Sequence, residues 1–163
     1  MKEQIKRKLR IYIDTSIIGG FFEKEFDAPT QALFQRLEKG EVIFVVSNIL
    51  TDEISEAKRQ DKRELLQQYN NDCFEYVKTT PEAETLADAY IAEGIVGIKH
   101  LADCQHIAIA TVNNVNILAS WNFRQIVNYD KITLYNNVNL RNGYKTIDIR
   151  NPKDLINYEN DTN

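Results

Sequence analysis

The sequence predicts an α/β fold, a three-layer α/β/α sandwich around a central, mostly parallel sheet. Short β-branched and aromatic runs alternate along the chain with longer stretches that have the punctuation and apolar spacing of helices. Residues 42–46 (Val-Ile-Phe-Val-Val) are apolar throughout, as expected of a strand covered on both faces. This order of elements indicates parallel strands joined by helices that cover both faces of one sheet.

The first strand–helix–strand unit begins near the amino terminus. Residues 9–13 (Leu-Arg-Ile-Tyr-Ile) have the composition of a strand. A helix is expected at 29–38, because Pro29 suits its first turn and Gly40 follows its end. The strand at 42–46 completes the unit.

A second group of elements follows in the middle of the chain. Ser47 is a plausible N-cap for a helix that runs to about Arg59 with its apolar residues on one face, and Asp61 is expected to open the next helix. Residues 73–77 alternate as a strand does, and Thr-Pro-Glu-Ala predicts a helix over 80–94.

The last third of the chain continues the alternation. Residues 101–113 contain neither Gly nor Pro and predict a largely buried helix, followed by a strand at 115–119. Short helices are expected at about 123–127 and 136–142, and a late strand at 145–149. These elements complete the predicted sandwich.

The chain has 163 residues and 18.9 kDa, which suits one domain, expected over 1–156 with a polar tail at 157–163. Hydrophobic residues make up 43% and charged residues 27%, typical of a globular protein. There is no apolar run of membrane-spanning or signal-peptide length, so we expect a cytoplasmic protein with no membrane contact.

The net charge of −4 argues against a protein that holds nucleic acid by bulk electrostatics. It does not argue against a metal-dependent nuclease, because a cation bound by a few acids reverses the local field and basic residues can flank the groove. The candidate flanking cations, each of which could equally lie on a solvated helix face, are Lys58, Arg59, Lys62, Arg63, Lys99 and Arg124.

Four short segments of the chain leave a strand or open a helix with an oxygen-bearing side chain. Asp14 and Asn122 follow predicted strands, Asp103 lies near the start of a helix, and Glu53 lies in the helix after the strand at 42–46. In an open parallel sheet, ligands bind in the crevice beyond the carboxyl ends of the strands. Ligands of a hard cation such as Mg²⁺ or Mn²⁺ usually come from several elements, so this dispersal is typical of such a site.

Each of these side chains also has an ordinary structural alternative. Asp14 could cap the next helix, and Glu53 has two acidic neighbours, Asp52 and Glu56, that compete for its role. Acids in the first turn of a helix and Asn residues in turns are common. The hypothesis of a metal site therefore depends on all four side chains together and not on any one of them.

In their order, these motifs resemble those of PIN domains. The similar segments are Ile-Asp-Thr-Ser-Ile-Ile, a helix with a central Glu, Asp-Cys-Gln-His-Ile-Ala-Ile-Ala and Ile-Leu-Ala-Ser-Trp-Asn-Phe, within about residues 10–130. The closing segment through Arg150 is similar to one subgroup of uncharacterised PIN proteins. The resemblance implies a PIN-like fold and an Mg²⁺- or Mn²⁺-dependent ribonuclease. Many small members are toxins of toxin–antitoxin pairs, of the virulence-associated protein C type.

Carried over by position, the resemblance implies metal ligands at Asp14, Glu53 and Asp103, with Asn122 as a fourth catalytic residue where many members have an acid. The resemblance implies that Ser16 lines the pocket, and we expect Thr15 and Ser120 to line it too. Among the flanking cations, we expect Lys99 and Arg124 to bind substrate. The expected reaction is metal-assisted attack of water on an RNA phosphodiester, leaving a 5′-phosphate and a 3′-hydroxyl. The implied partners are RNA, a cognate antitoxin and a second copy of the chain.

Two other functions are alternatives to a metal-dependent ribonuclease. Asn122 lowers the charge of the cluster, although an amide oxygen can still ligate a hard cation, so a catalytically weak module that binds RNA or protein is the alternative. A phosphatase of the haloacid dehalogenase type needs a second Asp two residues after the first, where this chain has Ser16. For His106 and Trp121 we expect packing or supporting roles.

Overall fold

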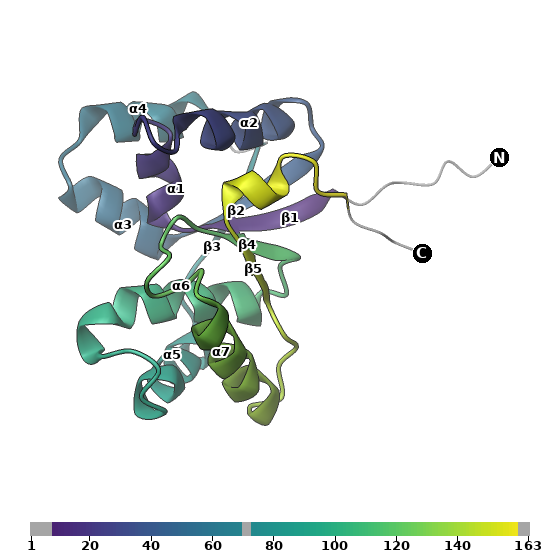
Figure 1. The fold of residues 1–163 in the computed structure, drawn as a ribbon. Helices are drawn as coiled ribbons and strands as arrows, with labels where there is room; N and C mark the ends of the chain where they lie inside the picture. Colours follow the sequence, from purple (N-terminus) through teal and green to yellow (C-terminus); the bar gives the residue numbers. More distant parts are fainter. Residues whose placement is uncertain (1–7, 70–72, 160–163) are drawn as a thin grey trace.

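The computed structural model describes residues 8–69 and 73–159, in which a five-stranded sheet is flanked by helices (Figure 1). The strands are β1 (Leu9–Ile13), β2 (Val42–Ser47), β3 (Phe74–Val77), β4 (Ile117–Ala119) and β5 (Asp148–Arg150). The helices are α1 (Thr15–Gly20), α2 (Asp27–Glu38), α3 (Asn48–Glu56), α4 (Gln60–Gln68), α5 (Pro81–Ala92), α6 (Leu101–Val112) and α7 (Tyr129–Arg141), with 3₁₀ turns η1 (Ile98–His100) and η2 (Pro152–Leu155).

The helices form two layers, one on each face of the sheet (Figure 1). Ile11 and Ile13 of β1 pack with apolar residues of α1 to α4, whereas Tyr12 between them packs with those of α5 to α7. Because side chains alternate along the strand, β1 contributes to the apolar cores on both faces of the sheet. The predicted three-layer α/β/α sandwich is confirmed.

The strand order is β3-β2-β1-β4-β5, and every pair is parallel. The order reverses at β1, whose neighbours are β2 and β4, and at such a point a crevice opens beyond the carboxyl ends of the strands. Just past these ends, the Asp14 amide donates to the Ala119 carbonyl over 3.3 Å. This bond holds the two segments that leave β1 and β4 side by side.

The predicted helix at 123–127 is wrong. These residues form a turn in which the amides of Ile126 and Val127 both donate to the carbonyl of Asn122, and the Asn122 side chain accepts from the Gln125 amide. The side-chain bond competes with helical pairing, as Asn often does.

The bounds of α7 and β5 also differ from the prediction. α7 begins at Tyr129, seven residues before the expected position 136, because Asn128 caps it by accepting from the Lys131 amide. The strand expected at 145–149 pairs only from Asp148, since Asn136 of α7 binds both the amide and the carbonyl of Ile147. The Asn136 side chain thus replaces a neighbouring strand as the hydrogen-bond partner of the Ile147 backbone.

Earlier bounds shift for local reasons. α2 begins at Asp27, two residues before the predicted start at 29. The short helix α1 was not expected, and α3 ends at Glu56, before Lys58, whose positive φ of 53° breaks helical geometry. In the carboxyl-terminal tail, Tyr158 packs partly against the core, whereas residues 160–163 lie outside the described part of the chain. Among the described residues, no helix is both long enough and apolar enough to cross a membrane.

The close approach of α1 to Trp121 generates a stability prediction. A Cβ on Gly20 would lie 2.6 Å from two atoms of the Trp121 indole, whose N–H donates to Thr30. Gly20→Ala is therefore expected to displace the indole and lower the free energy of unfolding by about 1–3 kcal/mol, measured by chemical denaturation.

The matched control is Gly97→Ala. Nothing lies within 4 Å of a Cβ at Gly97, and its φ of −75° suits alanine, so this substitution is expected to be close to neutral. Equal stability of the two variants would contradict the packing described here.

Candidate active site

The carboxyl ends of β1 and β4 open into a cavity of about 400 Å³. Six of the predicted catalytic and pocket-lining residues line it, namely Asp14, Thr15, Ser16, Glu53, Asp103 and Asn122. They come from the segment after β1, from α1, α3 and α6, and from the segment after β4. The fold thus brings the four dispersed oxygen-bearing side chains to one cavity.

Asp14 is the most buried carboxylate of the cavity, with 3% of its surface exposed. It occupies the N-cap position of α1 but makes no side-chain capping bond, so the capping interpretation is wrong. Its two oxygens accept instead from Ser16 Oγ over 2.6 Å and from Ser120 Oγ over 2.7 Å. Burial raises the pKa of Asp14, and this effect exceeds the opposing influence of His106 and the two hydroxyls.

Glu53 is the acid of α3 that faces the cavity. Its Oε1 lies 3.0 Å from Thr15 Oγ1 and 2.9 Å from His106 Nε2. Burial acts to raise the pKa of Glu53, but His106 and Thr15 together outweigh it and the net pKa is lowered. The competing acids Asp52 and Glu56 are exposed and do not line the cavity.

Asp103 and Asn122 lie next to each other in the cavity. The Asn122 amide nitrogen lies 3.3 Å from Asp103 Oδ1, and its oxygen accepts from the Gln125 amide. His100 Nδ1 lies 3.3 Å from the other oxygen of Asp103. Burial raises the pKa of Asp103, against the lowering effect of His106 and His100. Asn122 therefore acts here as a donor to a neighbouring acid, and its oxygen is already engaged.

The remaining predicted residues lie in different places. Ser120 is fully buried beside Asp14, whereas Lys99 and Arg124 are exposed and do not line the cavity. Among the candidate flanking cations, Lys62 of α4 does line it. Glu23 lines it too and was not predicted, because it lies in a turn with no strand end or helix start to mark it.

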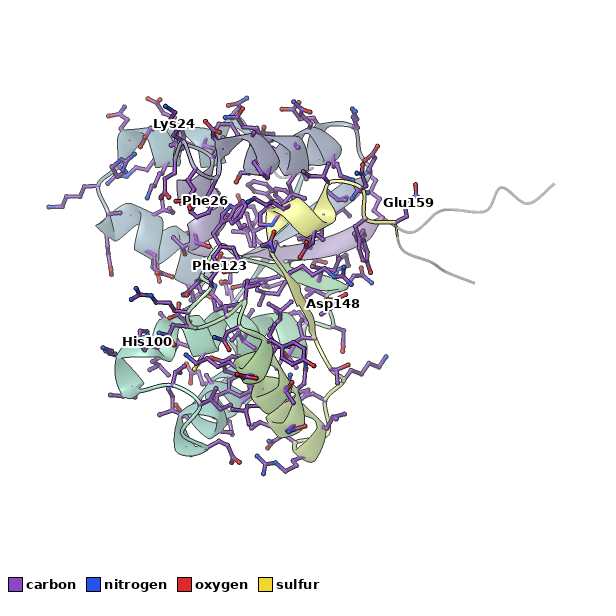
Figure 2. The ribbon with its side chains drawn as sticks, in the orientation of Figure 1. Lys24, Phe26, His100, Phe123, Asp148 and Glu159 are labelled. Atoms are coloured by element: carbon purple, nitrogen blue, oxygen red, sulfur yellow. The ribbon has the colours of Figure 1, made fainter. Side chains whose placement is uncertain are left out.

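Aromatic rings form one side of the cavity. Phe26 and Trp121 both line it, and their rings stack with centroids 4.2 Å apart. Phe123, which is 46% exposed, lies beside both rings, and Figure 2 shows Phe26 and Phe123 close together on the face turned to the viewer. Trp121 itself is 5% exposed, consistent with the expected packing role. Phe26 gave no sequence signal, because it is an isolated aromatic outside every predicted element.

The donor set of this cavity suits a hard cation. Asp14, Glu53 and Asp103 supply carboxylate oxygens, which Mg²⁺ and Mn²⁺ prefer, and a cation would stabilise the ionised forms that burial disfavours at Asp14 and Asp103. Within the described residues, however, no three His, Cys, Asp or Glu side chains are grouped closely enough to hold a metal ion as they stand. The three acids turn toward hydroxyl, amide and imidazole groups.

No protein-family model and no curated protein matches the chain. Solved structures do match its fold. FitAcB from Neisseria gonorrhoeae matches with a TM-score of 0.58 and 14% identity, over 88% of this chain and 98% of that one. VapBC2 from Rickettsia felis, bound to a DNA fragment from its promoter, gives 0.54 and 13% over the same shares. The chain has the PIN-domain fold.

A third PIN-fold match comes from Mycobacterium tuberculosis. VapC20, described as a toxin that cleaves the sarcin–ricin loop, matches with a TM-score of 0.53 and 12% identity, over 70% of this chain and 91% of that one. At sequence identities this low, the structural similarity establishes the fold alone, and the predicted PIN-like fold is confirmed.

The buried charge of Asp14 predicts a pH-dependent change in stability. Its folded-state pKa lies above the ordinary value of 3.8, so the folded state binds this proton more tightly than the unfolded state does. The stability of the metal-free protein therefore falls as pH rises from 3.8 through the folded-state pKa. Asp14→Asn lacks this charge and should match the parent at about pH 3 but exceed it by on the order of 1 kcal/mol at about pH 7.

The measurement is denaturant unfolding in the presence of a chelator at both pH values. The exposed Asp52→Asn serves as the control and should show no such gain. A parent as stable as Asp14→Asn at neutral pH would contradict an unfavourable buried charge at this position.

Proposed function

We propose that this protein is a PIN-type endoribonuclease that depends on Mg²⁺ or Mn²⁺. The observation that carries the proposal is the meeting of three acids, from three separate parts of the chain, in one cavity at the strand ends of a PIN fold. VapC20, a toxin described as cleaving the sarcin–ricin loop, has the same fold and supports the proposal.

In this proposal Asp14, Glu53 and Asp103 hold the cation. The bound ion would supply positive charge at the scissile phosphate and lower the pKa of an attacking water. Ser16 and Ser120 hold both oxygens of Asp14 in place, so that this carboxylate is oriented before substrate arrives. Lys62, the basic residue lining the cavity, is placed to contact an RNA phosphate.

RNA is the substrate that best suits the aromatic side of the cavity. Phe26 and the exposed Phe123, both packed against Trp121, give flat surfaces on which unpaired bases can stack, and Arg124 follows Phe123 on the surface. We expect the reaction to leave a 5′-phosphate and a 3′-hydroxyl.

We further propose that the protein is the toxin of a toxin–antitoxin pair, acts in the cytoplasm and forms a homodimer. The supporting observation is the fold shared with VapBC2 and FitAcB, the first of which is described as bound to a fragment of its promoter. A short reading frame directly upstream that encodes a DNA-binding protein would support the pair, and an isolated gene would argue against it.

The nuclease proposal predicts a loss of activity on charge removal. Asp14→Asn and Asp103→Asn are each expected to lower kcat on single-stranded RNA at least about a hundredfold in Mn²⁺ or Mg²⁺, because each removes a proposed ligand. Cleavage of a labelled RNA followed by gel electrophoresis measures the rate, and circular dichroism checks that each variant is folded.

The matched control is Asp52→Asn, which removes an exposed acid of α3 outside the cavity and should cut at the parental rate. If both cavity variants are folded and cut RNA as fast as the parent, the assignment of these acids is wrong.

A second candidate function, a catalytically weak binding module, is favoured by one observation. Asn122 stands where many PIN domains have an acid, so it adds no negative charge, and its amide oxygen already accepts from the Gln125 amide. Its amide nitrogen instead donates to Asp103. Three acids then have to bind the ion without help from this position.

Substitution of Asn122 separates the two functions. If the protein is a nuclease, the parent binds Mn²⁺ below millimolar concentration, and Asn122→Asp tightens binding about tenfold because ligand charge increases. The same substitution should lower the stability of the metal-free protein at neutral pH, since it places two carboxylates together. Isothermal titration calorimetry and denaturant unfolding measure the two effects.

Asn128→Asp controls for added charge, because Asp caps a helix as well as Asn does. A parent that binds no Mn²⁺ at millimolar concentration would favour the module.

A further inference from the structure

We propose that Ser47, Tyr12 and His106 form a buried hydrogen-bonded chain that positions Glu53 for the divalent cation. This inference rests on the proposed function, because it concerns how one acid of that site is oriented. It assigns positioning roles to two residues of strands and one of α6, none of which is a proposed ligand. We call this series the buried polar chain.

The contacts of the buried polar chain are short and continuous. Tyr12 Oη lies 2.6 Å from Ser47 Oγ and 2.6 Å from His106 Nδ1. On the other side of the imidazole ring, His106 Nε2 lies 2.9 Å from Glu53 Oε1. Ser47 and Tyr12 are fully buried and His106 is 2% exposed, whereas the Glu53 side chain is 39% exposed. The chain thus runs from the interior to the cavity wall.

The chemistry of its two ends determines which atoms donate. An ionised Glu53 can only accept, so the 2.9 Å contact between His106 Nε2 and Glu53 Oε1 requires the proton to be on Nε2. Tyr12 faces Nδ1 and keeps its own proton, because burial strongly raises its pKa. The tyrosine hydroxyl thereby occupies Nδ1 and leaves Nε2 to donate to the acid.

Ser47 indicates that this arrangement is specific. It occupies the N-cap position of α3, where a serine hydroxyl normally accepts from a helix amide, yet it makes no such bond. Its hydroxyl is directed instead to Tyr12. The Ser47 hydroxyl therefore does not stabilise the start of α3 but binds Tyr12. Its role at this position is in the buried polar chain.

The consequence for Glu53 is a fixed carboxylate. Its Oε1 accepts from His106 and Thr15, whereas its Oε2 has no hydrogen-bond partner among the described residues. A half-exposed glutamate without these contacts would sample several rotamers. The buried polar chain therefore presents one oxygen of Glu53 to the cavity, in the way that supporting hydrogen bonds orient metal ligands in general.

The test compares three substitutions by calorimetric titration of the full chain with Mn²⁺. Tyr12→Phe removes one hydroxyl, and His106→Leu removes the donor at similar size. Both are expected to raise the Kd for Mn²⁺ about 10- to 100-fold. His106→Gln retains an N–H donor and should recover most of the loss. At saturating Mn²⁺, kcat should return toward the parental value with an unchanged KM for RNA.

The control for loss of a buried tyrosine hydroxyl is Tyr90→Phe. Tyr90 is also fully buried and donates to Asn139 of α7, away from the cavity. It should bind Mn²⁺ as the parent does. If Tyr12→Phe and His106→Leu are folded and bind Mn²⁺ with the parental Kd, the proposal is overturned.

A second readout needs no metal. Nitrogen-15 spectra of the imidazole side chains should place the His106 proton on Nε2 in the metal-free parent, and Tyr12→Phe should move part of it to Nδ1. The chain has two histidines, so His100→Asn identifies the signals. Absence of Mn²⁺ binding by the parent would overturn the proposed function, whereas a His106 proton on Nδ1 would overturn the buried polar chain by itself.

Discussion

The Asp14 carboxyl group lies at the end of the central strand with 3% of its surface exposed, and much of the site is arranged around it. An isolated ionised carboxylate in such a place is strongly disfavoured, so its oxygens need donors close at hand. Ser16 comes from the following helix and Ser120 from the end of β4, and the two hydroxyls satisfy both oxygens. The alignment of β1 with β4 is therefore a condition for the hydrogen bond from Ser120, which offsets part of the cost of ionising this acid inside the protein.

Two residues in N-cap positions are used in the same way. Asp14 precedes α1 and Ser47 precedes α3, and neither side chain makes a capping bond. By contrast, Thr80 and Asn128, which lie outside the cavity, do cap their helices. Polar side chains near the cavity thus form hydrogen bonds with other polar side chains there, whereas helices elsewhere are stabilised by side-chain caps.

The sequence predicted the parts of the fold that depend on local patterns. The apolar run of β2, the position of Asp14 after β1 and the order of strands and helices were sufficient for the sandwich and for bringing four side chains to one edge. Glu53 could be distinguished from Asp52 only in the structure, since the choice depends on which side of α3 meets α6. The Tyr12–His106 contact joins residues 94 positions apart, and no local pattern encodes it. The late start of β5 has the same origin, because Asn136 competes for the backbone of Ile147.

Each of the two helical layers contributes residues to the cavity. The order of the strands along the sequence determines when, during synthesis, these residues can come together. Glu53 belongs to the layer of α1 to α4, while Asp103 and His106 belong to the layer of α5 to α7. β4 is inserted beside β1 although more than a hundred residues separate them, as the 106 positions between Asp14 and Ser120 show. During synthesis from the amino terminus, β1, β2 and their helices can pack before β4 exists. The cavity is then incomplete until the segment that follows β4 has emerged, so a partly synthesised chain has the acids but not the site.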